Sequence, residues 1–256
     1  MLTFLADNRA LEADYSMVSG TENVQFPLSN IAHDFTTKVF RSNETSVEIL
    51  VDLRATTSID SFAIVGSSVD GIGIGDISIQ GSATADFTGA TTIEIDLSAE
   101  YNFGFKFFDA ASFRYWKLIV SNTSGSYVEI SNIYLGAKTQ LLTNGFSTSS
   151  FNYVSSDNAS VVQNRYGQRF IDYHNRRNML TGKVEHATQA EFTEINDVIM
   201  QHGTTEPLFF VLDPDGETAT DGEFLFSGYF YLTEDFSYTF SGPQLYNISL
   251  TLEEAT

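Results

Sequence analysis

The chain contains no cysteine, only one tryptophan and four prolines, and far fewer basic than acidic residues. The lack of cysteine excludes disulfides, thiolate metal sites and thiol catalysis together. With 13 Lys and Arg against 33 Asp and Glu, the formal net charge is −20. Phosphate backbones and anionic lipid surfaces repel such a protein, so we expect no sequence-specific nucleic-acid binding.

Long hydrophobic runs are missing as well. The N-terminal Met1–Ala6 is followed at once by Asp7, Asn8 and Arg9, which makes it too short for a signal sequence. No run of about 18 apolar residues occurs elsewhere in the chain. We therefore expect no membrane insertion, and a protein that folds in the cytosol.

What the chain does have is length and aromatic content. Its 256 residues are 42% hydrophobic and include 22 Phe and 12 Tyr, enough for a substantial core. Aromatic and β-branched residues favour strands, so the composition indicates a mainly β protein. The pattern changes near the Gly136–Thr139 stretch, which we interpret as a break between two domains, residues 1–138 and 139–256.

The first domain shows short alternating strands without helical periodicity between them. We expect the first forty residues to be loop-like, and the rest to form an antiparallel jelly-roll sandwich. Alternation and bounding turn residues predict strands at Val47–Asp52, Ser58–Val65, Asp76–Gln80, Thr91–Asp96, Phe105–Phe108, Tyr115–Ser121 and Val128–Leu135.

The second domain is predicted to be a β-sandwich or barrel with one flanking α-helix, Thr188 to His202. Thr188 and Glu191 form a capping box at the start of the helix, and Gly203 stands directly after its last residue, where helices commonly end in glycine. Only one face of this helix is apolar, so it should lie against a sheet as a lid. That face consists of Phe192, Ile195, Val198 and Ile199, and the expected strands are Arg169–His186, Pro207–Leu212, Glu223–Leu232, Ser237–Ser241 and Leu245–Glu253.

Few residues suggest a reaction, and we expect no catalytic, cofactor-binding or metal-binding residues. The glycine-rich Gly71–Gly75 run lacks the Lys-Ser/Thr ending of a phosphate loop and precedes no helix. No Gly-x-Ser-x-Gly elbow selects a nucleophile, and the two positioned carboxylates of a glycosidase are not visible in sequence. The histidines lack metal-ligand spacing; they are His33, His174, His186 and His202.

Two further motifs have simple interpretations. The acidic loop at 213–223 offers clustered oxygens for calcium, although its spacing differs from an EF-hand and a solvated connection is the simpler interpretation. Its acids are Asp213, Asp215, Asp221 and Glu223. Asn122 and Asn158 each begin a glycosylation sequon, which we interpret as chance matches. The Gly145–Asn164 segment fits either a strand pair or an arm that reaches a neighbour.

Residues 1–138 resemble the discoidin, or coagulation-factor C-type, galactose-binding-like domain. Asn30–Ser42 matches the opening motif of that family, and Val47–Leu53 its first core strand. Ser58–Val65 resembles the next strand, and Phe113–Val120 the late aromatic-Arg-Tyr strand. The resemblance implies a sandwich whose loops recognise saccharide or protein, here through Arg41 or the Asp70–Gly75 turn.

The chain departs from this family where members with a calcium site have their ligands. His33 and Phe35 stand in the two Asp positions of the opening motif, and Lys38 in its Thr position. Asn132 replaces a calcium-contacting Glu, and Phe40 replaces the core Trp. The resemblance therefore does not extend to a bound calcium.

Residues 139–256 resemble the β-sandwich-plus-helix unit of tailed-bacteriophage tail tubes and distal tail rings. The resemblance rests on element order and on the final strand Gln244–Glu254. Together the halves suggest a structural baseplate protein of the virion, assembled in the host cytoplasm. Its implied partners are the tube, tape-measure and hub proteins, further copies in a ring of six or three, and host-surface saccharide.

An alternative interpretation is a carbohydrate-binding adhesin module that the second domain merely presents. The two interpretations make different demands: the structural role requires assembly into defined rings, and the adhesin role requires measurable glycan affinity. An enzyme is the third and weakest interpretation.

Overall fold

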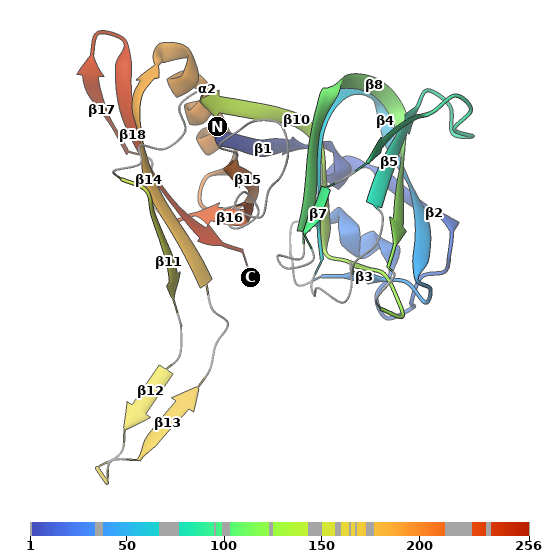
Figure 1. Cartoon of the computed structure of the whole chain (residues 1–256), viewed down its shortest axis with the longest axis horizontal. Helices are drawn as coiled ribbons and strands as arrows, with labels where there is room; N and C mark the ends of the chain where they lie inside the picture. The colour runs from blue at the N-terminus through green and yellow to red at the C-terminus, as the bar shows by residue number, and fades with distance from the viewer. Residues whose placement is uncertain are drawn as a thin grey trace. The chain divides into compact units, whose positions relative to one another are not determined.

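The computed structural model describes most of the chain as strands, with one α-helix among the described residues (Figure 1). Contacts divide the chain into two units, which we describe separately. The sandwich unit contains Thr3–Gln140 and Phe209–Gly228, and the helix unit contains Leu141–Leu208 and Tyr229–Thr256 with the first two residues. The described residues are 2–33, 38–66, 77–94, 96–98, 103–122, 125–142, 150–156, 160–163, 165–166, 168–172, 177–212, 227–233 and 237–255.

Two long strands form the centre of the sandwich unit. β4 (Ser46–Val65) and β8 (Phe103–Ser121) pair antiparallel, with irregularities in register after Asp52 and after Ile59. The sequence predicts two strands within each of these segments. The antiparallel pairing of β4 with β8 continues on both sides of each irregularity. The two strands predicted in each segment are therefore one long strand with a local bend.

The expectation of a loop-like first forty residues is wrong. β1 (Leu2–Asn8) lies between β10 (Asn132–Leu142) and β15 (Leu208–Leu212), and β2 (Asp14–Ser19) pairs with β4. Thr3, Phe4 and Leu5 of β1 are all buried, so this strand faces core on both sides and lacks alternation. Two 3₁₀ helices, η1 (Arg9–Glu12) and η2 (Leu28–Ala32), complete this region.

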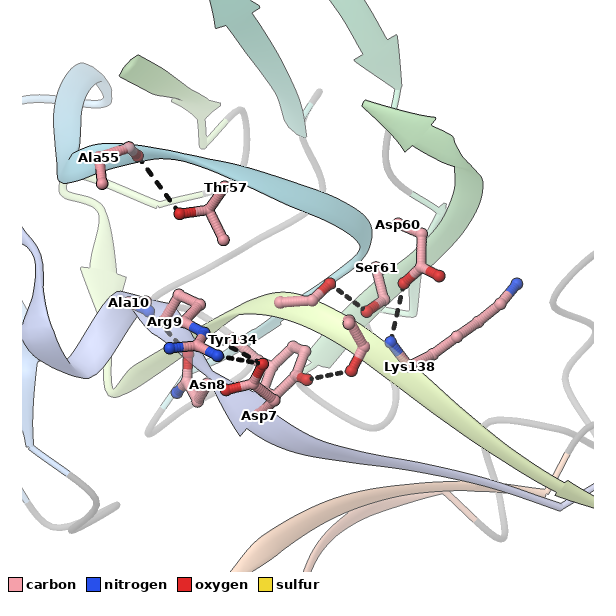
Figure 2. A network of polar contacts seen from close by, with 12 residues as sticks. Asp7, Asn8, Arg9, Ala10, Ala55, Thr57, Asp60, Ser61, Tyr134 and Lys138 are labelled. Atoms are coloured by element: carbon pink, nitrogen blue, oxygen red, sulfur yellow. Dashed lines mark hydrogen bonds and ion pairs between the residues drawn. The ribbon is translucent and has the colours of Figure 1, made fainter. Parts of the chain in front are cut away.

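β10 runs through the Gly136–Thr139 stretch without interruption, and contacts divide the two units after Gln140, close to the domain boundary expected at residue 138. A Cβ at Gly136 would lie 1.9 Å from the backbone oxygen of Asp7 and 2.7 Å from the Tyr134 hydroxyl. Glycine is therefore required by the close passage of β1, and no turn is involved. Figure 2 shows the surrounding bonds: Ser61 Oγ donates to the Gly136 carbonyl at 2.8 Å, and the Lys138 N–H donates to Asp60 Oδ1 at 2.8 Å.

β15 joins the sandwich unit although it lies late in the chain. Phe210 packs 5.4 Å from the Phe4 ring, and Phe209 packs edge-on to Phe103 at 5.7 Å. The boundary expected near residue 138 would place this strand in the second domain. Its apolar Leu-Phe-Phe-Val-Leu sequence gives no indication of which sheet it enters.

The remaining strands close the sandwich unit over a single apolar cluster. The one tryptophan, Trp116, is 1% exposed and packs against Phe108 and Phe113. The strands are β3 (Phe40–Arg41), β5 (Ile77–Ser82), β6 (Thr91–Glu94), β7 (Asp96–Ser98) and β9 (Glu129–Ile130). β5 and β7 pair with β8, β6 with β5, and β3 with β9.

The helix unit has a small antiparallel sheet and a separate ribbon. β14 (Arg177–Thr188) lies between β11 (Asn152–Ser156) and β18 (Leu245–Glu254), while β16 (Gly228–Leu232) and β17 (Ser237–Gly242) also pair with β18. β12 (Ser160–Gln163) and β13 (Arg169–Asp172) form a two-stranded sheet of their own.

The helix prediction is confirmed. α2 (Gln189–His202) begins after Thr188, whose hydroxyl accepts from the Glu191 N–H at 3.3 Å, while Glu191 Oε2 accepts from the Thr188 N–H at 2.7 Å. Gly203 ends the helix with φ 58°. Ile195 is buried, and α2 contacts β14 and β18, as expected of a lid. α2 is neither long nor apolar enough to cross a bilayer, and the described residues contain no other α-helix.

The fold-class prediction, mainly β with one flanking helix, is thus confirmed.

Candidate functional site

A cluster of aromatic and charged side chains lies where β3 pairs with β9, at the lower end of the sandwich unit in Figure 1. The Arg41 guanidinium lies 4.5 Å from the Phe26 ring centre and 4.4 Å from that of Tyr127. Its Nε donates to Glu129 Oε2 at 2.8 Å, and Nη2 donates to the same oxygen. We call Phe26, Arg41, Tyr127 and Glu129 the Arg41 cluster.

Burial differs sharply across this ion pair. The Glu129 side chain is 2% exposed, whereas the Arg41 side chain is 31% exposed. The buried carboxylate therefore anchors the arginine, whose side chain remains partly exposed to solvent. Two aromatic faces and a charge-assisted bond fix its orientation before any ligand arrives.

Exposed polar side chains lie on the segments that precede Phe26 and follow Arg41 in the chain. Thr21 Oγ1 donates to Glu44 Oε1 at 3.2 Å, and Asn43 Nδ2 donates to the Glu22 carbonyl at 3.0 Å. Thr21, Glu22, Asn43 and Glu44 are all exposed, and we call them the polar rim. Hydroxyl, amide and carboxylate groups thus lie within five residues of Phe26 or Arg41 in the chain, a combination of groups that suits a small polyhydroxylated ligand.

The loop that supplies Tyr127 is held by a buried asparagine. Asn122 is 3% exposed; its Nδ2 donates to the Tyr127 carbonyl at 2.7 Å, and its Oδ1 accepts from the Gly125 N–H at 2.7 Å. Both polar atoms of its amide are therefore bonded inside the protein, which agrees with the interpretation of this sequon as a chance match.

Asn30, Phe40 and Asn132, three positions compared with the discoidin-type family, have structural roles here. Phe40 is fully buried, as expected of the residue in the core Trp position. Asn132 Nδ2 donates to the His33 carbonyl at 2.7 Å, and Asn30 Nδ2 donates to the Val39 carbonyl at 2.8 Å. Asn132 therefore ties down a loop as a donor, a role that a calcium-binding carboxylate could not perform.

A second charged network lies on the outer surface of β2, β4 and β8. Arg114 donates to both Asp52 oxygens at 2.8 Å, and these bonds hold the pKa of Asp52 below its ordinary value, while burial opposes the shift. Arg54 likewise bonds Asp14 and lowers its pKa. Arg54 has φ 63° and lies at the register irregularity between β4 and β8. Sequence reasoning missed this network because its members are 40 and 62 residues apart.

Several predicted positions lie outside the described residues. They are the Gly71–Gly75 run with the Asp70–Gly75 turn, the acidic loop residues Asp213, Asp215, Asp221 and Glu223, together with Phe35, Asn158 and His174. Among the described residues, no group of three or more His, Cys, Asp or Glu could hold a metal ion. His33, His186 and His202 are described and belong to no such group.

About half of the chain is similar in structure to known proteins, whereas searches by sequence find no match. No family profile matches the chain, and no curated protein matches it. A CBM32 module of a family 31 glycoside hydrolase from Clostridium perfringens has a TM-score of 0.43 at 12% identity, covering 52% of this chain and 99% of that module. The lectin domain of Lectinolysin complexed with Lewis B antigen has 0.43 at 13%, covering 50% and 95%.

A third similar structure is chitosan-binding module 1 from a Paenibacillus chitosanase/glucanase. Its TM-score is 0.44 at 17% identity, and the alignment covers 51% of this chain and 98% of that module. All three similar structures are of carbohydrate-binding modules or lectin domains.

Proposed function

We propose that the sandwich unit is a non-catalytic carbohydrate-binding module, and that its saccharide binds on the Arg41 cluster and polar rim. The observation that supports this most directly is the partly exposed Arg41 side chain, whose guanidinium lies against the rings of Phe26 and Tyr127. Its orientation is set in the free protein by buried Glu129, so binding a ligand requires little side-chain ordering.

The chemistry of a sugar fits this arrangement. Each pyranose ring has hydroxyls that both donate and accept hydrogen bonds, and an apolar face of C–H groups that packs on aromatic rings. Beyond their bonds to Glu44 and Glu22, Thr21 offers acceptor lone pairs and Asn43 offers an N–H donor and an acceptor oxygen, while Glu44 accepts. The exposed edges of Phe26 and Tyr127 provide the apolar contact. The net charge of −20 disfavours polyanionic glycans, so we expect a neutral or amino sugar.

A glycan array followed by calorimetric titration tests this proposal. Asn43→Ala and Thr21→Ala change the polar rim without touching the Arg41–Glu129 ion pair, and we expect each to weaken binding about tenfold, the loss of one hydrogen bond or slightly more. Thr91→Ala, on β6 of the same unit, is the matched control and should bind like the wild type. If no glycan on the array binds the protein, the proposal is refuted. If a glycan binds but both rim variants keep the wild-type affinity, the polar rim is not its binding site.

A second candidate is a structural component of a phage tail tip, in which the sandwich unit contacts a host saccharide or another tail protein. The observation in its favour is the helix unit, where a capped helix contacts β14 and β18 of an antiparallel sheet, and β18 is the last described strand in the chain. Under this candidate the chain forms a ring of six or three copies around the tail channel, beside tube, tape-measure and hub proteins.

Negative-stain electron microscopy at high protein concentration tests the tail candidate. Closed rings with a central hole support it and give the symmetry. Monodisperse particles without rings, also after addition of the neighbouring tail proteins, refute it while leaving the saccharide proposal intact.

A further inference from the structure

Charge is unevenly distributed along the second half of the chain. Residues 184–256 contain 14 acidic side chains and neither Lys nor Arg. The preceding segment, 160–183, contains five basic residues and one acid, and it includes the β12–β13 ribbon. In this strongly acidic chain, the basic segment 160–183 thus directly precedes a segment that has acidic residues but neither Lys nor Arg.

The ribbon presents this positive charge to solvent. Arg165 and Arg169 are exposed, and Tyr166, beneath the Arg165 guanidinium at 4.7 Å, is 74% exposed. β12 and β13 pair only with each other among the described strands. An isolated two-stranded hairpin is marginally stable in water, so packing on another surface would stabilise it.

Helix α2 offers a surface of opposite charge. Glu194 and Asp197 are three residues apart on one face of the helix, and both are exposed. Met200, one further turn along the same side, is 76% exposed. An arginine that pairs with these carboxylates would also cover the Met200 side chain with its aliphatic stem.

We propose that the β12–β13 ribbon of one molecule binds the acidic face of helix α2 on a second copy of this chain. The complementary charges are on the same polypeptide, and every copy carries both surfaces. Such a contact is head-to-tail, so that repeated copies close into a ring or extend into a filament. The proposal deepens the tail candidate by naming its subunit contact, and it is independent of the saccharide site.

The alternative of a nucleic-acid ligand for the ribbon is less favoured. The whole chain has a net charge of −20, which repels phosphates. A second copy meets no such opposition at α2, and salt at physiological strength screens the remaining repulsion between copies beyond about 8 Å.

Charge reversal measured by sedimentation velocity tests the proposal with the full chain. Arg165→Glu/Arg169→Glu should abolish self-association, and so should Glu194→Arg/Asp197→Arg. The chain that carries all four changes should associate again, because the charges are exchanged and still complementary. Arg9→Glu/Arg54→Glu, on exposed arginines of the sandwich unit, makes the same change of net charge as the ribbon variant and should leave association unchanged.

The outcomes separate clearly. A monomeric wild type at all salt and protein concentrations overturns the proposal, and so does association that survives ribbon reversal. Rings that persist in the ribbon variant would overturn this contact and leave the tail candidate standing. Failure of the four-fold variant to associate, when circular dichroism shows it folded, also contradicts the pairing. Wild-type binding to a fluorescent oligonucleotide that ribbon reversal removes, without self-association, would assign the ribbon to nucleic acid instead.

Discussion

Replacing Arg41 by methionine should destabilise the sandwich unit strongly, because it leaves Glu129 charged and buried. The Glu129 side chain is 2% exposed and bonds Arg41 through one oxygen. Breaking a buried pair from one side typically costs 3–5 kcal/mol. Since Arg41 is 31% exposed, solvent already weakens the pair, and we expect about 3 kcal/mol, including the contacts with Phe26 and Tyr127.

The two halves of the pair should behave unequally. Glu129→Leu leaves an arginine that can turn towards water, so we expect it to cost less than Arg41→Met. The double variant Arg41→Met/Glu129→Leu removes both charges and should lie within about 1 kcal/mol of the wild type, since buried pairs are often replaceable by apolar residues. A double-mutant cycle should therefore give a coupling energy of about 2 kcal/mol or more.

Trp116 makes this measurement simple, because it is the only tryptophan and is buried in the sandwich unit. Its fluorescence during denaturant unfolding reports that unit alone, and a 3 kcal/mol loss corresponds to roughly 6–12 °C in Tm for a unit of this size. A loss below about 0.5 kcal/mol in Arg41→Met, or additive losses in the double variant, would refute the reasoning.

Three further predictions concern single positions. Gly136→Ala should cost the sandwich unit about 3 kcal/mol or more by Trp116 fluorescence, because its Cβ would meet the Asp7 carbonyl at 1.9 Å; tolerance within about 0.5 kcal/mol would contradict the close approach. Thr188→Ala should cost the helix unit about 1 kcal/mol by calorimetry, while Thr188→Ser should restore the cap. Burial raises the pKa of the Glu254 carboxyl above its ordinary value of 4.5. Its contribution to stability is therefore full below pH 4.5 and is lost as pH rises through the folded-state pKa. Glu254→Gln should stabilise the helix unit at pH 7, and an equal gain at pH 4 would contradict this assignment.

The sequence predicts most reliably the features that depend on neighbouring residues. Thr188 and Glu191 are three positions apart, so their reciprocal bonds can be read directly from the chain. β1 escapes detection because burial of both faces removes the alternation that indicates a strand. The Arg41–Glu129 pair joins positions 88 residues apart, and no local pattern indicates it. Arg41 itself is suggested by the resemblance of residues 1–138 to a known family, but its partners are visible only in the fold.

The late arrival of β15 has a consequence for biosynthesis. Residues 3–140 emerge from the ribosome first, yet the strand that pairs with β1 begins at Leu208. At about 5–20 residues per second, roughly 70 further residues take on the order of 4–14 seconds to be made. During that interval Phe4 lacks its packing partner Phe210, and the edge of β1 is open to other chains. We therefore expect the nascent sandwich to expose an unpaired strand edge until β15 has been translated.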